Sequence, residues 1–536
     1  MTRALQTGIP EPQHEQSSTA AGAASTTRRR RKSAIPESAF VTTLRRELFA
    51  VGKGLMSRLW RLHLTYVGGD GGSTRGWPEK VVAKMTPHKV RARAVGAVLK
   101  LFRSEVEWYT RGMPAITGLA APECYYAADG GYGRYVLLLE DMAPAKTLSQ
   151  LKGLDKAHAL VAARAAARLH AGYRDRVGTA PETKGWVLRA DDDHYYGLVG
   201  KTYRAALAGL WKNGGARFKK YDMDPATAVS PAFRAAADLV AARWDDLQAA
   251  RRDLAAPASA GSTRHSTLCH GDFRVENMFF DAGGAASMLE GADRRFRAVD
   301  YQLVKEYAGE SDLSYMVAGS LTTEARRACE REVLLEYYHA MRANGVPGYT
   351  MQELLLEYQG SLLNPLVISV CTQAETTGDD SARGRRLVKE CFFERIDACL
   401  TDWNFLASLE LLLKKYSEEG PHPTWSANEA RAVLPEQWHD LLGMDGVAST
   451  HDAAAASPFH AGGSFVVAKE RSKVTRAIEE DAVHEALPGE LDGSEERHFR
   501  NRLASLDAHE RADLGTIAEG GGGGGGGGGA TVVPSG

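Results

Sequence analysis

The chain has 536 residues and a net charge of -1 at pH 7, so its overall charge attracts neither nucleic acid nor an anionic membrane. Hydrophobic residues make up 44% and charged residues 25%, which is typical of a globular protein and excludes a wholly disordered or collagen-like chain. The six cysteines form no Cys-x-x-Cys pair, so we expect no disulfide framework, no zinc site and an intracellular, cytoplasmic location. We also expect no membrane span, because the longest apolar stretch, around 362–371, contains Asn364 and Pro365 and is short.

The two ends of the chain differ from the middle in composition. Residues 1–43 are rich in Ser, Thr, Ala, Gln and Pro, and residues 446–536 are rich in Ala and charge and include ten consecutive glycines from 520 to 529. Such segments bury too little apolar surface to offset their ordering entropy, so we expect mostly disordered tails, with one amphipathic helix over 494–506. The basic run 28–32 is interpreted as a solvated tail, with nuclear import, a transit peptide or a kinase target left open.

Residues 44–142 have the pattern of several strands around one helix. Apolar residues alternate with polar ones from Trp60 to Tyr66, and a short β-branched run follows at 80–85, so both segments predict strands. Val98, Leu101, Phe102, Glu105 and Tyr109 recur at helical spacing, which predicts a helix over 95–109 with these residues on one face. Two more strands are predicted at 123–127 and 135–139.

From about 150 the pattern becomes mainly helical. Asp155 is predicted to cap a helix that ends near Gly172. Further helices are predicted over roughly 196–212, 231–255, 312–344, 351–373 and 383–415. A short strand-like region, rich in turn residues, lies between them at 267–299.

The chemistry-bearing residues gather in this strand-like region. His270-Gly271-Asp272 is followed five residues after the aspartate by Asn277, and Asp300 follows a short apolar strand. Phosphoryl transfer needs such a set, because one carboxylate accepts the proton of the attacking hydroxyl. An amide oxygen and a second carboxylate are ligands that magnesium prefers. Gly271 lets the backbone turn tightly and direct Asp272 into a cleft.

These motifs resemble the catalytic segment of aminoglycoside phosphotransferases and choline kinases, and most closely that of the ecdysteroid kinase-like small-molecule phosphotransferases. The resemblance covers roughly residues 44–415 and is most specific between 268 and 320, where Asp300-Tyr-Gln302 and Asp312-Leu-Ser-Tyr315 also match. It implies an α+β, bilobal protein-kinase-like fold. The N-lobe would be a small antiparallel sheet over 44–142, and the C-lobe a larger, mostly helical lobe over 143–445. The implied enzyme transfers phosphate from ATP, with Mg²⁺, to a hydroxyl of a small molecule.

The resemblance also assigns roles to single residues. Asp272 would be the catalytic base and Asn277 would act beside it, while Asn277 and Asp300 would hold the metal. Lys84 would contact phosphates and pair with Glu105, although Glu107 is the alternative partner. In the supporting set, His270 is interpreted as a structural residue of the loop, and the set also includes Gln302 and Asp312. A plain helix N-cap is the alternative for Asp312.

Two further nucleotide contacts are weaker predictions. Gly52 and Gly54, with Ser57, would form a phosphate-binding loop, but a plain hairpin turn has the same sequence. Backbone groups near Glu140 to Met142 would hold adenine, but a buried strand that ends at a loop would have the same sequence.

Other interpretations stay open at this stage. A nucleotide-binding pseudokinase that acts through its tails is disfavoured, because Lys84, Asp272, Asn277 and Asp300 are all present. A protein kinase is disfavoured because Gly271 stands where those enzymes have arginine. The acidic run 191–193 before His194 is interpreted as a solvated loop or helix start. The acceptor, the oligomeric state and the target of Arg274, a substrate acid or an acceptor-site carboxylate, are not predicted. Five aromatic residues are candidates for the acceptor pocket, although core packing is their commoner role: Tyr195, Tyr196, Trp211, Tyr358 and Trp403.

Overall fold

The computed structural model describes residues 40–49, 57–67, 78–87, 90–113, 115–116, 118–255, 264–281, 296–374, 382–420 and 424–446. The chain divides into two units, Met1–Glu470 and Arg471–Gly536, and every described residue belongs to the first. The predicted phosphate loop at Gly52 and Gly54, the predicted helix over 494–506, the basic run and the polyglycine therefore lie outside the described residues.

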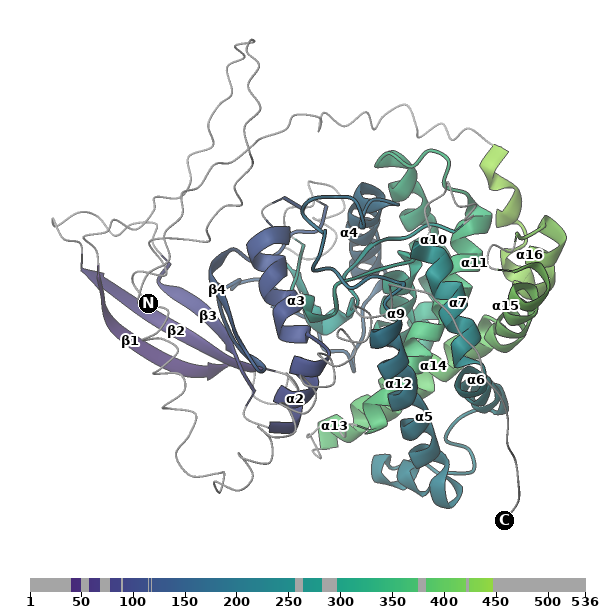
Figure 1. Cartoon of the computed structure of the whole chain (residues 1–536), viewed down its shortest axis with the longest axis horizontal. Helices are drawn as coiled ribbons and strands as arrows, with labels where there is room; N and C mark the ends of the chain where they lie inside the picture. The colour runs from purple at the N-terminus through teal and green to yellow at the C-terminus, as the bar shows by residue number, and fades with distance from the viewer. Residues whose placement is uncertain are drawn as a thin grey trace, which may run out of the picture. The chain divides into compact units, whose positions relative to one another are not determined.

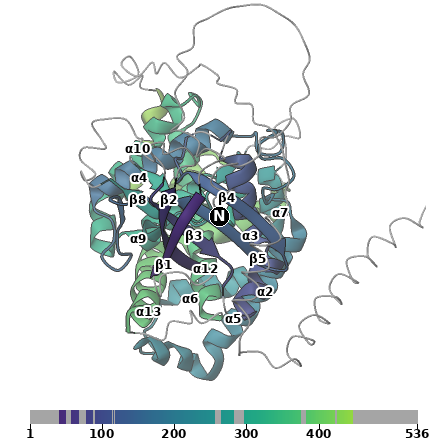
Figure 2. The same ribbon diagram turned by 90° about the vertical axis from the view of Figure 1, so that its left-hand side faces the viewer.

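A five-stranded antiparallel sheet in the order β1-β2-β3-β5-β4 forms the N-terminal part of this unit (Figures 1 and 2). Its strands are β1 (Phe40–Phe49), β2 (Arg58–Val67), β3 (Lys80–Met85), β4 (Cys124–Gly131) and β5 (Arg134–Glu140). The strands predicted at 60–66, 80–85, 123–127 and 135–139 are thus confirmed. The boundary of the predicted N-terminal tail at residue 43 is wrong, because β1 already pairs with β2 from Phe40 onward. That pairing, which local composition does not reveal, satisfies the backbone groups of the segment.

Two helices replace the single one predicted over 95–109. They are α2 (Val90–Val98) and α3 (Leu101–Glu107), and a π-helical turn, Trp108–Gly112, follows. Lys100 adopts a left-handed conformation with φ 56°, which separates α2 from α3. Val98, predicted on the buried face, is therefore 46% exposed.

The two faces of the sheet have different surroundings. Val81 and Ala83 of β3 point to one face and join a small apolar cluster with Leu62 and Leu64 of β2. Side chains alternate along a strand, so Lys84 points to the other face, where α3 packs. Glu105 of α3 is completely buried. The alternation of side chains along β3 and the helical spacing along α3 therefore place Lys84 and Glu105 together between the sheet and the helix.

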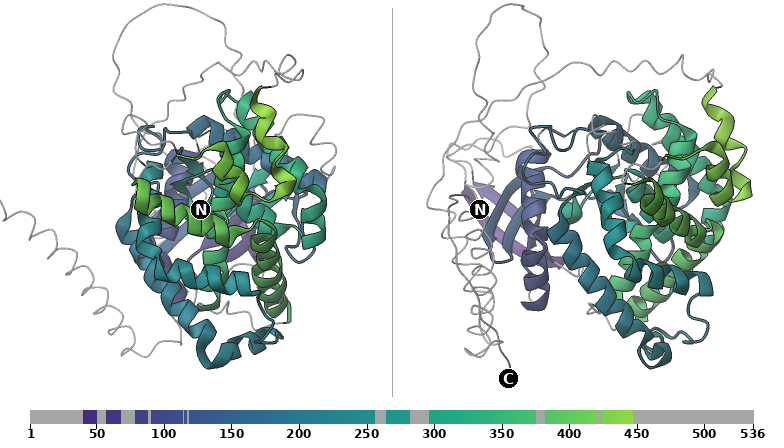
Figure 3. Two further views of the ribbon diagram at one scale, coloured as in Figure 1. Left: turned by 90° about the vertical axis from the view of Figure 1, so that its right-hand side faces the viewer. Right: turned by 45° about the vertical axis from the view of Figure 1, so that its right-hand side comes forward.

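Helices form most of the remaining described residues (Figure 1), as the resemblance implied. Figure 3 shows the helices of residues near 400–446, drawn in light green, on the face away from the sheet. The α-helices are α4 (Lys156–Tyr173), α5 (Asp193–Gly215), α6 (Pro231–Ala242), α7 (Trp244–Ala255), α9 (Glu310–Ser320), α10 (Thr323–Ala343), α11 (Met351–Ser361), α12 (Leu363–Ala374), α13 (Ala382–Arg386), α14 (Arg395–Asp402), α15 (Phe405–Glu419) and α16 (Ala427–Val433). The fold is thus α+β, with a small antiparallel-sheet lobe and a larger, mostly helical lobe.

The helix predictions were right in kind, but several long ranges are divided. Asp155 caps α4 as predicted, and its side chain accepts a hydrogen bond from the His158 amide. The range predicted as one helix over 312–344 is α9 and α10, because Thr322 starts a new helix by capping the Ala325 amide. Capping side chains compete with helix continuation in this way.

Two small sheets hold the segment between these helices, in the region predicted to be strand-like. β7 (Thr267–Cys269) pairs antiparallel with β10 (Lys305–Tyr307). β8 (Met278–Phe280) lies between β6 (Lys146–Thr147) and β9 (Arg297–Ala298). These strands fix both ends of the segment that contains Asp272, Asn277 and Asp300.

One described segment, Met351–Thr372, which joins α11 and α12, is long and apolar enough to cross a membrane, with a mean hydropathy of 1.3. In its most apolar window of 18 residues, 56% is buried inside the fold. Tyr358, Leu362 and Leu366 belong to the main hydrophobic core, and none of the three is exposed. This packing is that of a core helix, which is consistent with the predicted absence of a membrane span.

Candidate active site

Lys84 occupies the centre of the candidate site, where it connects the sheet lobe to the helical lobe. Its ammonium lies 2.7 Å from Glu105 Oε1 and 2.9 Å from Asp300 Oδ1. Burial lowers the pKa of Lys84, but the two carboxylates outweigh this effect and raise the pKa above its ordinary value. Glu107, the alternative partner, pairs instead with Arg111 at 3.4 Å. Glu105 is therefore the partner of Lys84 in this structure.

Asp272 and Asn277 face each other across residues 270–277, the candidate catalytic loop. The Asn277 Nδ2 donates to the Asp272 backbone oxygen at 2.9 Å and to Asp272 Oδ2 at 2.8 Å. Asn277 ends a short 3₁₀-helix, Val275–Asn277, and this turn brings an amide five residues away back onto the carboxylate. The Asp272 side chain remains 19% exposed, so solvent or a substrate can reach it.

Gly271 is required by a close contact between two segments. Its φ is +81°, and a Cβ built on it would lie 2.0 Å from the backbone oxygen of Leu303. No side chain fits at that distance. The segment after Asp300 is therefore held directly against the catalytic loop.

A buried polar network supports this loop from α9. Asp312 Oδ1 accepts the Gly271 amide at 2.8 Å, and Asp312 Oδ2 accepts the His270 amide at 2.6 Å. Asp312 is the third residue of α9, not its N-cap, so the N-cap alternative is wrong. His270 Nε2 lies 3.0 Å from the Val299 oxygen, and His270 Nδ1 accepts the Asp272 amide at 3.2 Å. The structural role predicted for His270 and Asp312 is consistent with these contacts.

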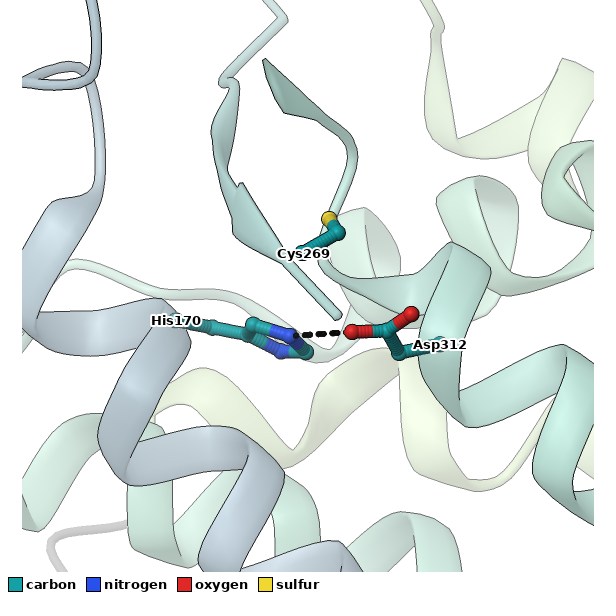
Figure 4. Close-up of side chains that lie close together, drawn as sticks. All are labelled: His170, Cys269 and Asp312. Carbon is teal, nitrogen blue, oxygen red and sulfur yellow. Dashed lines mark hydrogen bonds and ion pairs between the residues drawn. The ribbon is translucent and has the colours of Figure 1, made fainter. Parts of the chain in front are cut away.

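Figure 4 shows three ligand-type side chains that lie close together: His170, Cys269 and Asp312. His170 Nε2 lies 3.2 Å from Asp312 Oδ2, and its Nδ1 lies 2.8 Å from the Tyr337 hydroxyl. Both ring nitrogens of His170 therefore have partners. Burial raises the pKa of the Cys269 thiol well above its usual range. We interpret the group as a hydrogen-bonded brace and not as a metal site.

Asn277 and Asp300 supply oxygens that fit magnesium. The Val299 amide donates to the Asn277 backbone oxygen at 3.0 Å. Asp300 directly follows Val299, so Asn277 and Asp300 are near each other in space. Asn277 uses its Nδ2 for hydrogen bonds, which leaves Oδ1 available. Burial raises the pKa of Asp300, but Lys84 outweighs it and keeps the pKa below its ordinary value, so Asp300 is ionised. Asp300 also has a left-handed φ of 69°, a strained conformation of the kind found at functional sites.

The remaining predicted site residues among those described are Gln302, Ser57, Glu140 and Met142. Gln302 Nε2 donates to Ser57 Oγ at 3.2 Å and to Glu105 Oε2 at 3.3 Å, so both residues join the Lys84 group. Glu140 ends β5 and forms an ion pair with Arg297 at 2.7 Å. Met142 lies just beyond β5 at the connection to the helical lobe. Their roles in nucleotide binding stay predictions.

Arg274 contacts the predicted base itself. Its Nε lies 3.2 Å from Asp272 Oδ1, and its Nη1 lies 2.9 Å from Glu276 Oε2 and 3.1 Å from Gln150 Oε1. Sequence reasoning missed Glu276 and Gln150. Glu276 directly precedes Asn277, so its place in the motif was a signal that could have identified it. Gln150 is 124 residues from Arg274 and gives no local signal.

The fold also shows where the acidic run 191–193 and two of the candidate aromatic residues lie. Asp192 caps α5, and Asp193 pairs with Arg252 at 2.9 Å, so the acidic run is a helix start as interpreted. Tyr358 and Trp403 are fully buried with ring centroids 4.7 Å apart. They are core residues, which is the commoner role expected of such aromatic residues.

A comparison with protein-family models matches residues 51–344, more than half of the chain, to the "Ecdysteroid kinase-like family". No curated protein sequence matches the chain.

Solved structures give weaker similarity. A choline kinase from Cryptosporidium parvum is 10% identical with a TM-score of 0.38 over 71% of this chain and 91% of that one. An ethanolamine kinase from Plasmodium vivax is 10% identical with a TM-score of 0.36 over 70% and 84% of the two chains. A choline/ethanolamine kinase family protein from Mesorhizobium loti is 14% identical with a TM-score of 0.34 over 68% and 92%. These scores are below 0.5, so the fold assignment rests on the strands and helices described above.

Proposed function

The chain belongs to the ecdysteroid kinase-like family, and on this premise we propose that it transfers the γ-phosphoryl group of ATP to a hydroxyl of a small molecule. The observation that carries the proposal is the position of Lys84 between Glu105 and Asp300. An ion pair of this kind is what phosphoryl-transfer enzymes of the kinase type need in order to place a lysine on the phosphates.

Each residue has a definite task in the proposed reaction. The acceptor oxygen forms a bond to the γ-phosphorus while the bond from that phosphorus to the β,γ-bridging oxygen breaks, and ADP leaves. Asp272 takes the proton of the acceptor hydroxyl, and Asn277 holds the Asp272 carboxylate in position through its Nδ2. Asn277 and Asp300 would hold magnesium, which would neutralise charge on the phosphates. Lys84 contacts the phosphates from the sheet lobe.

The test is ATP consumption by the purified full-length chain with alcohols, sterols, amino sugars, choline and nucleosides as acceptors. Asp272→Asn should lower turnover by about 10²- to 10⁴-fold, which is the usual contribution of a general base. Asp245→Asn, at a side chain that is 90% exposed, is the matched control and should keep full turnover. Unchanged turnover in Asp272→Asn would contradict the assignment of the base. Binding of Mg·ATP without consumption for any acceptor would contradict transfer and favour a pseudokinase.

A further inference from the structure

Arg251 differs from the other strongly buried basic residues of the described chain. Lys84, Arg326 and Lys415 each contact two carboxylates, and Arg395 donates to three backbone carbonyls. Arg251 is 4% exposed, yet its Nε and Nη2 have no hydrogen-bond partner, and no described carboxylate pairs with it. A buried cation without a partner costs free energy unless something supplies the missing charge.

The surroundings of Arg251 contain further polar groups without partners. Its guanidinium lies 4.1 Å from the centre of the Tyr196 ring, which offsets part of the charge. The Tyr196 hydroxyl is itself buried without a hydrogen-bond partner. Tyr307 of β10 interacts electrostatically with Arg251, so these side chains of α5, α7 and β10 are neighbours.

Lys305 lies on the same face of β10 as Tyr307, because side chains two residues apart on a strand share a face. Its Nζ is 5.1 Å from the Tyr307 ring and 3.5 Å from Asn364 Oδ1, and no described carboxylate forms an ion pair with it. The side chain is partly exposed. Burial lowers the pKa of Lys305, and the nearby Arg251 charge acts in the same direction. Lys305 and Arg251 are thus two cations that share one region. The described carboxylates that act on them, Asp312 and Asp272 on Lys305 and Asp193 on Arg251, do so at a distance and form no ion pair with them.

The backbone fixes Lys305 next to the catalytic loop. Lys305 pairs with Cys269, three residues before Asp272, and three residues span at most about 10 Å. The contact of Gly271 with Leu303 holds the two segments together. Lys305 also interacts electrostatically with Asp272. A small molecule whose hydroxyl lies at Asp272 could therefore reach Lys305 with another group.

We propose that Lys305, with Arg251 and Tyr196 beside it and Asn364 in contact, binds an anionic group of the acceptor, so that the preferred substrates are hydroxylated carboxylates, sulfates or phosphates. This inference rests on the proposed function, because it places the acceptor hydroxyl at Asp272. The two cations of the site, Lys305 and Arg251, and its uncharged donors, the Tyr196 hydroxyl and the Asn364 amide, are complementary to an anion.

The first test uses matched acceptors and the full chain with Mg·ATP. Each hydroxy acid, alcohol sulfate or alcohol phosphate is compared with its neutral amide or its unsubstituted alcohol, and the anionic member should be turned over with a higher kcat/KM by about tenfold or more. Lys305→Met should raise the KM for the anionic member by about 10- to 100-fold and leave the KM for ATP unchanged. Lys305→Arg should restore part of the affinity. Equal kcat/KM for anionic and neutral members in the wild type would overturn the proposal.

The second test does not need turnover. Binding of acetate, sulfate and inorganic phosphate is titrated with the nucleotide position filled by Mg·AMP-PNP, so that each anion reports on the Lys305 region. Wild type should bind at least one anion, Lys305→Met should lose most of that binding, and Lys414→Met, on an exposed part of α15, should keep it. Anion binding that is lost in Lys305→Met supports the inference even when no acceptor is phosphorylated, in which case only the proposed function fails. Equal binding by wild type and Lys305→Met overturns it, and a thermal melt of Lys305→Met checks that the variant is folded.

Discussion

Lys84 Nζ lies 2.9 Å from Asp300 Oδ1, although 216 residues separate them in sequence. Lys84 belongs to the central strand β3 of the sheet, and Asp300 directly precedes the 3₁₀-helix Tyr301–Leu303 in the helical lobe. The bond therefore joins the predicted phosphate-binding residue to the predicted metal-binding residue across the two lobes.

Removal of the Lys84 ammonium should weaken nucleotide binding. In Lys84→Met the charged contact to phosphate is lost, and such contacts contribute enough to raise the Kd of Mg·ATP by about 10- to 100-fold. Lys80→Met is the matched control, because Lys80 lies on the same strand with an exposed side chain. Calorimetric titration of both variants measures the effect. An equal Kd for the two variants would show that Lys84 does not contact the nucleotide.

Gly271→Ala should be strongly destabilising because of the contact with Leu303. The added Cβ would lie 2.0 Å from a backbone oxygen, so the segment after Asp300 would have to move. We expect a loss of about 2–4 kcal/mol, from overpacking together with the left-handed φ. Gly185→Ala is the control, because Gly185 has φ +83° and nothing within 4 Å of its added Cβ, so it reports the conformational cost alone. Urea unfolding of both variants gives the comparison, and equal losses would contradict the contact.

Arg274 should affect turnover more than nucleotide binding. Its guanidinium holds Asp272 Oδ1 and links it to Glu276, so Arg274→Ala frees the carboxylate that must accept the proton. We expect kcat to fall by about tenfold or more, since misplacement of a catalytic group by 1 Å costs on the order of 10²-fold, while the Kd of Mg·ATP stays the same. Arg274→Lys should recover part of kcat. Steady-state kinetics together with nucleotide titration separate the two effects, and a loss confined to ATP affinity would refute this role.

Glu310 should make stability depend on pH. Burial raises its pKa to about 7 from an ordinary value of 4.5, assisted by the nearby Glu357 and Glu353 carboxylates. The folded state therefore retains a proton that the unfolded state releases between these two values. The free energy of unfolding should fall as the pH rises from about 4.5 to 7, by at most about 3 kcal/mol from this group.

Glu310→Gln provides the measurement for this effect. The amide stays neutral at every pH and can still accept the hydrogen bond from Tyr349. The difference in unfolding free energy between wild type and Glu310→Gln should therefore shift in favour of the variant between pH 5 and pH 7.5, as measured by urea unfolding. A difference that does not change with pH would show that Glu310 ionises normally in the folded chain.

The sequence by itself predicted most strands and helices, and the resemblance to kinase-like phosphotransferases implied the two-lobe architecture and most of the candidate site residues. Strand and helix patterns depend on local residues. β2 followed from the alternation of apolar and polar side chains, β3 and β5 from short apolar runs, and the Asp155 cap from its position ahead of a helical pattern. The spacing of Asp272, Asn277 and Asp300 also follows from the local chain, and it indicated phosphoryl-transfer chemistry. Lys84 and Glu105 could be matched because each lies on the predicted face of its own element.

Only the tertiary structure decided which groups have partners. The break at Lys100 and the pairing of β1 from Phe40 depend on neighbours that are distant in sequence. The role of Asp312 as an acceptor for the loop amides, and the contact of Gly271 with Leu303, also join separate segments. The unpaired charge of Arg251 is a property of its surroundings. A sequence shows which residues can carry charge, but whether that charge is neutralised depends on which side chains the fold places within a few ångströms of it.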